Sequence, residues 1–135
     1  MQKEAKARIK IMKIWLDDQR EAPQGWVHLH NIKEVEHFIK SVRRQKDFRI
    51  DTMSFDFHLS HPKRGIDVMK YLVELCSKNN SRKFWPRTVL YHSDDPKGVE
   101  IMQVFAMNFE KKMMPKYNKQ EDKKSFFENL FKLKN

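Results

Sequence analysis

The sequence predicts an α/β fold in which the strands of a mostly parallel, four- to five-stranded sheet alternate with helices. Short apolar or β-rich runs end in polar residues, and amphipathic helical patterns separate them. A run of four to eight apolar residues is typical of a strand buried on both faces. Right-handed crossovers bring the carboxyl ends of parallel strands to one edge of the sheet. We therefore expect one domain with its polar groups gathered at that edge.

Length and charge limit the class of protein. The 135 residues suit one domain, which we place at 12–135, preceded by a basic arm over 1–11. A net charge of +10 favours a polyanionic partner, with RNA or nucleotides as the first candidates and solubility alone as the alternative. Because the sequence contains neither a membrane span of roughly 20 apolar residues nor a signal peptide, we expect a cytoplasmic protein with no membrane partner. The single cysteine, Cys76, fits a helix core.

The first half of the chain contains two predicted strands and one helix. The run at 13–16 ends at Asp17 and Asp18, and residues 26–30 alternate like a short strand near a sheet edge. Asn31 is the expected N-cap of a helix. The apolar residues that recur along this helix are Ile32, Val35, Phe38, Ile39 and Val42.

The second half repeats this alternation. A strand within 50–57 reaches Asp56, a helix follows Gly65, and the strand at 87–91 reaches His92. The next helix carries an apolar face that we expect to pack on the sheet, formed by Val99, Ile101, Met102, Val104, Phe105 and Met107. An amphipathic helix from Ser125 closes the chain. We expect it to be a lid on the sheet, with contact to a protein partner or homodimer as the alternative.

Polar side chains follow three of the predicted strands. Asp17, Asp18 and Asp56 offer carboxylates on neighbouring strands, which suit Mg²⁺, so we expect these three to be metal ligands. Histidine ordinarily titrates near neutrality, so we expect His58 and His92 to act as general acid and base, and Ser93 can donate to a phosphate oxygen. Basic residues in the following loops would bind phosphate or RNA; they are Arg20, Lys63, Arg64 and Lys97. The structural alternatives are a cap or turn role for a strand-end Asp and solvent-facing or structural roles for His28 and His30.

Several ordered motifs resemble those of the cyclic-phosphate-processing receiver-like domain. They are Trp15-Leu16-Asp17-Asp18-Gln19-Arg20, Ser54-Phe55-Asp56-Phe57-His58-Leu59, Gly65-Ile66-Asp67-Val68 and His92-Ser93-Asp94-Asp95-Pro96-Lys97-Gly98. The resemblance covers Met12 to about Phe109. It implies a receiver-like, flavodoxin-type, three-layer fold that acts on cyclic phosphates at RNA ends, with Asp56 at the position of the receiver phosphoacceptor.

The chain departs from the family pattern at two places. Asp56-Phe57-His58-Leu59 stands where the family usually has Asp-His-Asp-Leu, and Asp95 stands where it usually has Asn. His58 would then supply the imidazole that the family places one residue earlier, although successive strand residues face opposite sides.

The leading hypothesis is phosphoesterase-like processing of the cyclic phosphate or phosphate ends of RNA by a magnesium-binding pocket. Its catalytic residues would be Asp17, Asp18, Asp56, His58, His92 and Ser93. One alternative is a non-catalytic receiver-like module that binds RNA, nucleotide or a protein partner. The other is a phosphorylation switch at Asp56.

Overall fold

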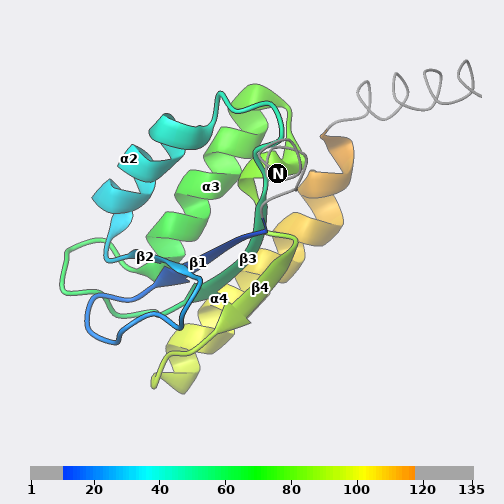
Figure 1. Ribbon diagram of the computed structural model, residues 1–135. Coiled ribbons are helices and arrows are strands. Elements are labelled where there is room, and N and C mark those ends of the chain that lie inside the picture. Colours follow the sequence, from blue (N-terminus) through cyan, green and yellow to red (C-terminus); the bar gives the residue numbers. More distant parts are fainter. Residues whose placement is uncertain (1–10, 118–135) are drawn as a thin grey trace, which may run out of the picture.

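The structure is a computed structural model that describes residues 11–117 (Figure 1). Within this range, no helix is long and apolar enough to cross a membrane. The C-terminal amphipathic helix and all but the last residue of the basic arm lie outside the described residues, so both remain predictions.

The sheet has four parallel strands in the order β2-β1-β3-β4. They are β1 (Met12–Leu16), β2 (Val27–Leu29), β3 (Ile50–Phe55) and β4 (Thr88–Tyr91). This order matches the first four strands of the flavodoxin-type sheet, which confirms the predicted fold class and the edge position of β2. Leu16 lies between Leu29 and Phe55 in register, so the strands end level with one another at their carboxyl ends.

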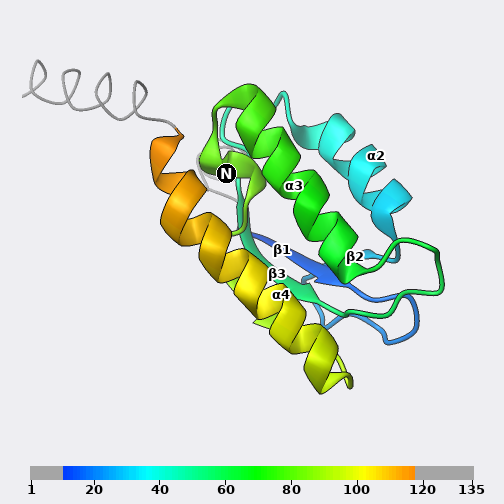
Figure 2. The ribbon, with the colours of Figure 1, turned by 180° about the vertical axis from the view of Figure 1, so that it is seen from behind.

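Within residues 11–117, the three α-helices cover one face of the sheet (Figures 1 and 2). They are α2 (Ile32–Val42), α3 (Gly65–Asn79) and α4 (Pro96–Asn108), followed by short helical turns at Phe109–Met113 and Met114–Lys116. A further turn, Arg82–Phe84, precedes β4. The strand side chains beneath the helices are fully buried; they are Ile14, Leu16, Met53 and Phe55. The helices of residues 11–117 thus form one layer, and the third layer of the expected fold is not part of the described chain.

Local capping explains where the helices begin and end. The Asn31 side chain accepts a hydrogen bond from the Glu34 N–H (3.0 Å), as predicted for the α2 N-cap. Asn80 ends α3 in the left-handed conformation, with φ of 48°. Asp95 caps α4 by accepting from the Gly98 N–H (3.0 Å), and Pro96 follows at the first helical position. The cap role expected as the alternative for a strand-end Asp therefore applies to Asp95.

The apolar face of α4 differs from the prediction. Met102 and Ala106 are buried, but Ile101, Val104 and Met107 are about half exposed, at 50%, 52% and 53%. The prediction that these three pack on the sheet is wrong. They lie on the side of α4 away from the buried Met102. Cys76, in contrast, is fully buried in the core, as predicted.

Candidate active site

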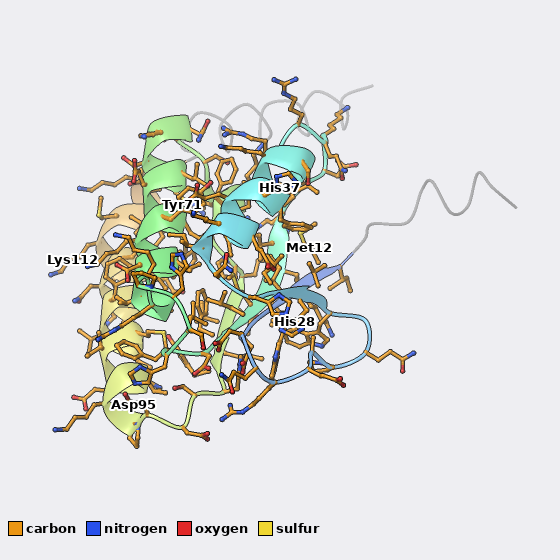
Figure 3. The ribbon with its side chains drawn as sticks, turned by 90° about the vertical axis from the view of Figure 1, so that its left-hand side faces the viewer. Met12, His28, His37, Tyr71, Asp95 and Lys112 are labelled. Atoms are coloured by element: carbon orange, nitrogen blue, oxygen red, sulfur yellow. The ribbon has the colours of Figure 1, made fainter. Side chains whose placement is uncertain are left out.

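A pocket of about 340 Å³ opens beyond the carboxyl ends of β1 and β3. Its lining residues are Asp17, Asp18, Gln19, Arg20, Asp56, His58, Leu59 and Ser60. In Figure 3, Asp95 labels the amino end of α4, which lies at the same end of the molecule as the loops after β1 and β3. The structure therefore brings together the three predicted metal ligands, one predicted proton-transfer residue and one predicted phosphate-binding residue.

Asp17 is buried and held in one orientation by the loop that follows β1. Its Oδ1 accepts the backbone N–H groups of Gln19 (2.8 Å) and Arg20 (2.9 Å), and its Oδ2 faces His92 Nε2 at 3.0 Å. His28 Nε2 donates to the Asp17 carbonyl oxygen at 2.6 Å. A buried carboxylate with this many donors is strongly fixed, because each lost partner would leave a desolvated polar group. His28 has the structural role that the sequence favoured.

Asp18, the next residue, is placed quite differently. Its side chain reaches the loop after β3, where Oδ2 accepts the Ser60 N–H at 2.6 Å. Partial burial acts to raise the pKa of Asp18, but the hydrogen bonds from Ser60 outweigh it, and the pKa is lowered. Asp18 is thus a carboxylate at neutral pH that ties the two strand-end loops together.

Carboxylate oxygens of Asp17, Asp18 and Asp56 lie within 4.8 Å of one another. Asp56 joins this group because its backbone N–H bonds to Leu16 O (3.0 Å), which extends the pairing of β3 with β1 by one residue. Hard oxygen donors at this separation are the ligand type that Mg²⁺ prefers, with water filling its remaining positions. The donor set therefore fits the metal that the sequence predicts.

His92 is fixed from three sides at the end of β4. Its ring stacks on Trp15 with centroids 3.7 Å apart, Nδ1 lies 2.7 Å from Ser54 Oγ, and Nε2 faces Asp17. Burial lowers the pKa of His92 against the opposing attraction of Asp17, so the ring is neutral at pH 7. The neutral tautomer that satisfies both contacts donates from Nε2 to Asp17 and accepts the Ser54 O–H at Nδ1. Both ring nitrogens are then used within the protein.

His58 is the more accessible imidazole, with its side chain 61% exposed in the pocket. Its Nε2 lies 2.6 Å from Asp95 Oδ2, the carboxylate that also caps α4. Phe57 turns to the opposite side, where it is buried against Gly98. A Cβ at position 98 would overlap the Phe57 ring, so glycine there lets α4 approach the strand end. The departure from the family motif thus places Phe57 in the core and leaves His58 facing the pocket.

The predicted phosphate-binding residues divide into two groups. Arg20 lines the pocket and donates to the His92 carbonyl oxygen and the Asp94 carboxylate. The other three, Lys63, Arg64 and Lys97, are exposed but do not line the pocket. The Arg64 guanidinium lies over the Phe57 ring at 5.5 Å. Ser93 also stands outside the lining, where its Oγ accepts the Asp95 N–H (3.2 Å) in the turn before α4.

Sequence reasoning missed three polar residues of this site. Ser60 and Gln19 line the pocket, and Ser54 is the buried hydroxyl that bonds His92. Ser54 gave a usable signal, because a serine between two buried apolar residues of a central strand needs a hydrogen-bond partner. Ser60 and Gln19 lie in loops whose path the sequence does not specify.

The comparisons with known proteins agree with this geometry. The family model described as the cyclic-phosphate processing receiver domain matches residues 12–108, from the first residue of β1 to the last residue of α4. Comparison with curated proteins and with solved structures finds no match. Because the family match covers well over half of the chain and includes every residue that lines the pocket, the protein belongs to the cyclic-phosphate processing receiver domain family.

Proposed function

We propose that the domain is a metal-assisted phosphoesterase that processes the 2′,3′-cyclic phosphate or phosphate ends of RNA. The observation that carries this proposal is the convergence of the Asp17, Asp18 and Asp56 carboxylates within 4.8 Å, in a pocket of a chain from this family. The net charge of +10 supports RNA as the larger ligand, since basic proteins gain affinity for it by counterion release.

Asp17, Asp18 and Asp56 would hold Mg²⁺. When bound, the ion would offset the negative charge of the phosphate and polarise its phosphorus–oxygen bonds. The protein supplies orientation: His92 and two backbone N–H groups fix Asp17, and Ser60 fixes Asp18. Arg20, already 4.0 Å from Asp17 Oδ2, would place a positive charge beside the phosphate.

His58 would move the proton. The Asp95 carboxylate accepts the Nε2–H, which leaves Nδ1 as an acceptor, and no residue of the described range hydrogen-bonds to that atom. In the proposed hydrolysis, Nδ1 takes a proton from water as the water oxygen bonds to phosphorus. The bond from phosphorus to O2′ or O3′ breaks, and the leaving oxygen takes a proton from His58 or solvent. The product is a phosphate monoester.

The direct test is incubation of the full chain with Mg²⁺ and an oligoribonucleotide that ends in a 2′,3′-cyclic phosphate. We expect the monoester to appear, and its rate to fall at least ~100-fold in Asp56→Ala and in His58→Ala. Matched controls are Glu100→Ala and His37→Ala, because both residues are exposed outside the pocket. In calorimetric titration with Mg²⁺, the heat of binding should be lost in Asp56→Ala and retained in His58→Ala and in the controls. No monoester from the unmodified chain would refute catalysis.

A second candidate is a non-catalytic module that binds RNA ends or nucleotides. The observation that favours it is that both nitrogens of His92 bond within the protein, so this imidazole is not available to a substrate. This candidate expects RNA-end binding without turnover, retained in His58→Ala. Parallel binding and product assays on the same variants separate the two functions.

A further inference from the structure

We infer that the end of the sheet opposite the pocket of Asp17, Asp18 and Asp56 is a second binding surface. It would bind the phosphate backbone of an RNA whose end lies in that pocket. The inference rests on the proposed function for its choice of ligand. We call this region the amino-end surface, because it surrounds the amino ends of β3 and β4 and the carboxyl ends of α2 and α3, at the top of Figure 1. Its basic residues are Arg43, Arg44, Lys46, Arg49, Arg82, Lys83 and Arg87.

A polar groove of about 390 Å³ lies in this surface. Its lining residues are Arg43, Lys46, Phe48, Asn79, Ser81, Lys83 and Phe84. No carboxylate is among them, whereas the pocket at the other end contains three. The described lining residues of the groove therefore offer cationic and neutral hydrogen-bonding groups and no acid, which is the chemistry that binds phosphate.

Two cations of the groove, Arg43 and Lys83, are held in place without acidic partners among the described residues. The Arg43 guanidinium and the Lys83 ammonium lie over the Phe84 ring, at 5.4 Å and 5.3 Å from its centroid. Arg43 donates to Asn79 Oδ1 (2.9 Å), and Lys83 donates to the Arg43 carbonyl oxygen (3.2 Å). Among residues 11–117, neither forms an ion pair. Two positioned cations on one ring form a preorganised anion site.

Arg49, which follows Phe48 of the groove lining, has a buried hydrogen-bond donor without an acceptor among the described residues. Its Nε is buried and has no hydrogen-bond partner within the described residues. Burial lowers the pKa of Arg49, and the charges of Arg87 and Arg82 lower it further. Among residues 11–117, the one acid paired with the Arg87 guanidinium is Asp51, at 4.0 Å. Positive charges that crowd together at a cost to the folded protein are expected where an anionic ligand offsets their repulsion.

Helix ends offer the structural alternative, because cations stabilise helix carboxyl ends. The ends of α2 and α3 each carry roughly half a negative charge. Together they offset about one cation, whereas the basic residues of this surface, even with Arg82 left out, outnumber Asp47 and Asp51, its acids among residues 11–117, by a wider margin. Capping of helical ends therefore accounts for Lys83 on the Arg43 carbonyl oxygen and for Arg82, which donates to the carbonyl oxygens of Met114, Pro115 and Tyr117. It does not account for Arg43, Arg44 and Lys46.

The two sites lie at a distance that one RNA strand can span. β3 has 6 residues between them, which corresponds to about 20 Å of strand. At about 3.4 Å per nucleotide in a stacked strand, roughly six nucleotides cover this distance. A mononucleotide would reach only the pocket, whereas an oligonucleotide of twelve would reach both sites.

The test compares the variant Arg43→Gln, Lys46→Gln, Lys83→Gln with the control Lys33→Gln, Lys70→Gln, Lys112→Gln, which removes equal charge from exposed positions outside the groove. The probe is a fluorescent twelve-nucleotide RNA with an unphosphorylated 3′ end, titrated by anisotropy at several salt concentrations. We expect the variant to lose at least ~10-fold in affinity and about 2 from the slope of log Kd against log salt, since each single-strand phosphate contact contributes about 0.7. The control should change less than 3-fold.

Equal losses in variant and control would overturn the inference, because binding would then follow net charge alone. Polyglutamate that competes as well as RNA at equal charge would also overturn it and point to an acidic protein. If circular dichroism finds the triple variant unfolded, Arg44→Gln, Lys46→Gln replaces it, since both side chains are exposed. Hydrolysis of a 2′,3′-cyclic mononucleotide should be equal in the unmodified chain, the groove variants and the lysine control. Loss of that activity in Asp56→Ala tests the proposed function separately, because the RNA probe does not require the pocket.

Discussion

The two ends of the sheet satisfy their charges in opposite ways. At the carboxyl end, acids converge and nearly every one is tied down: Asp17 by two N–H groups and His92, Asp18 by Ser60, and Asp95 by Gly98 and His58. At the amino end, Arg49 has a buried Nε with no partner among the described residues. The comparison teaches that one end is a rigid site whose geometry is set by the protein, while at the other end the described residues supply fewer acids than bases, a difference that an anionic ligand can offset. Variants at the two ends should therefore have opposite effects on stability.

The largest effect should separate the two adjacent acids of the carboxyl end. Asp17→Ala removes the acceptor of two backbone N–H groups and of His92, so we expect it to destabilise the fold by about 3 kcal/mol as well as to abolish activity. Asp18→Ala should also lose activity, but its free energy of unfolding should fall by less than about 1 kcal/mol. The reason is that the main protein partner of Asp18, the Ser60 N–H, lies in an exposed loop. Urea unfolding measures the change in stability of each variant, and the hydrolysis assay measures its activity. Equal destabilisation by the two variants would contradict the division between a buried and an accessible acid.

The second effect tests how closely the helices must approach the site. A Cβ at position 65 would overlap the Asp56 carbonyl oxygen, which is backbone and cannot rotate away. We expect Gly65→Ala to cost about 2–3 kcal/mol in unfolding free energy and to lower the affinity for Mg²⁺ by displacing Asp56. Gly25→Ala is a control for backbone strain without overlap, since that glycine has space around it but a φ of 88° that alanine rarely adopts. It should lose stability, by about 1–2 kcal/mol, and keep its affinity for Mg²⁺. A Gly65→Ala protein of normal stability and metal affinity would show that Asp56 is not held by this contact.

Much of this arrangement follows from the sequence for a simple physical reason. Polar residues after parallel strands must meet at one edge, so Asp17, Asp18 and Asp56 could be placed together from their positions alone. The different roles of Asp17 and Asp18 could not, because they depend on the path of the loop that returns its N–H groups to Asp17. The pairing of His92 with Ser54 joins strands whose register the sequence does not give.

Helix α4 illustrates a second limit of the sequence. Its spacing predicted a helix correctly, but hydropathy does not reveal whether another element covers each side. Ile101, Val104 and Met107 therefore read as core and are half exposed in the structure. The amino-end surface was invisible for a similar reason: its basic residues come from separate segments, and only the fold gathers them around one groove.

A smaller effect of opposite sign is expected at the amino end. Arg49→Met keeps the aliphatic length of the side chain but removes the unpartnered Nε and the repulsion from Arg87. We expect the variant to be more stable by up to about 1 kcal/mol, since an unsatisfied buried donor is costly, and to bind RNA more weakly. Thermal unfolding and the anisotropy titration measure the two quantities on one sample. A less stable protein would place Arg49 among the structural residues and remove the contrast between the two ends.

The smallest effect concerns the pH dependence of stability at the carboxyl end. The pKa of Asp18 is lowered in the folded protein, so its ionised form stabilises the fold above its ordinary pKa. That contribution is lost as pH falls below about 4 and through the folded pKa. Asp18→Asn should therefore be slightly less stable than the unmodified chain at pH 6. With metal removed by a chelator, the difference in Tm should shrink as the pH falls through the folded pKa of Asp18. A difference in Tm that stays constant from pH 6 to pH 3 would mean that the Ser60 contacts do not favour the charged carboxylate. Repulsion from Asp17 and Asp56 would then govern this acid, and Asp18 would depend on the metal for its place in the site.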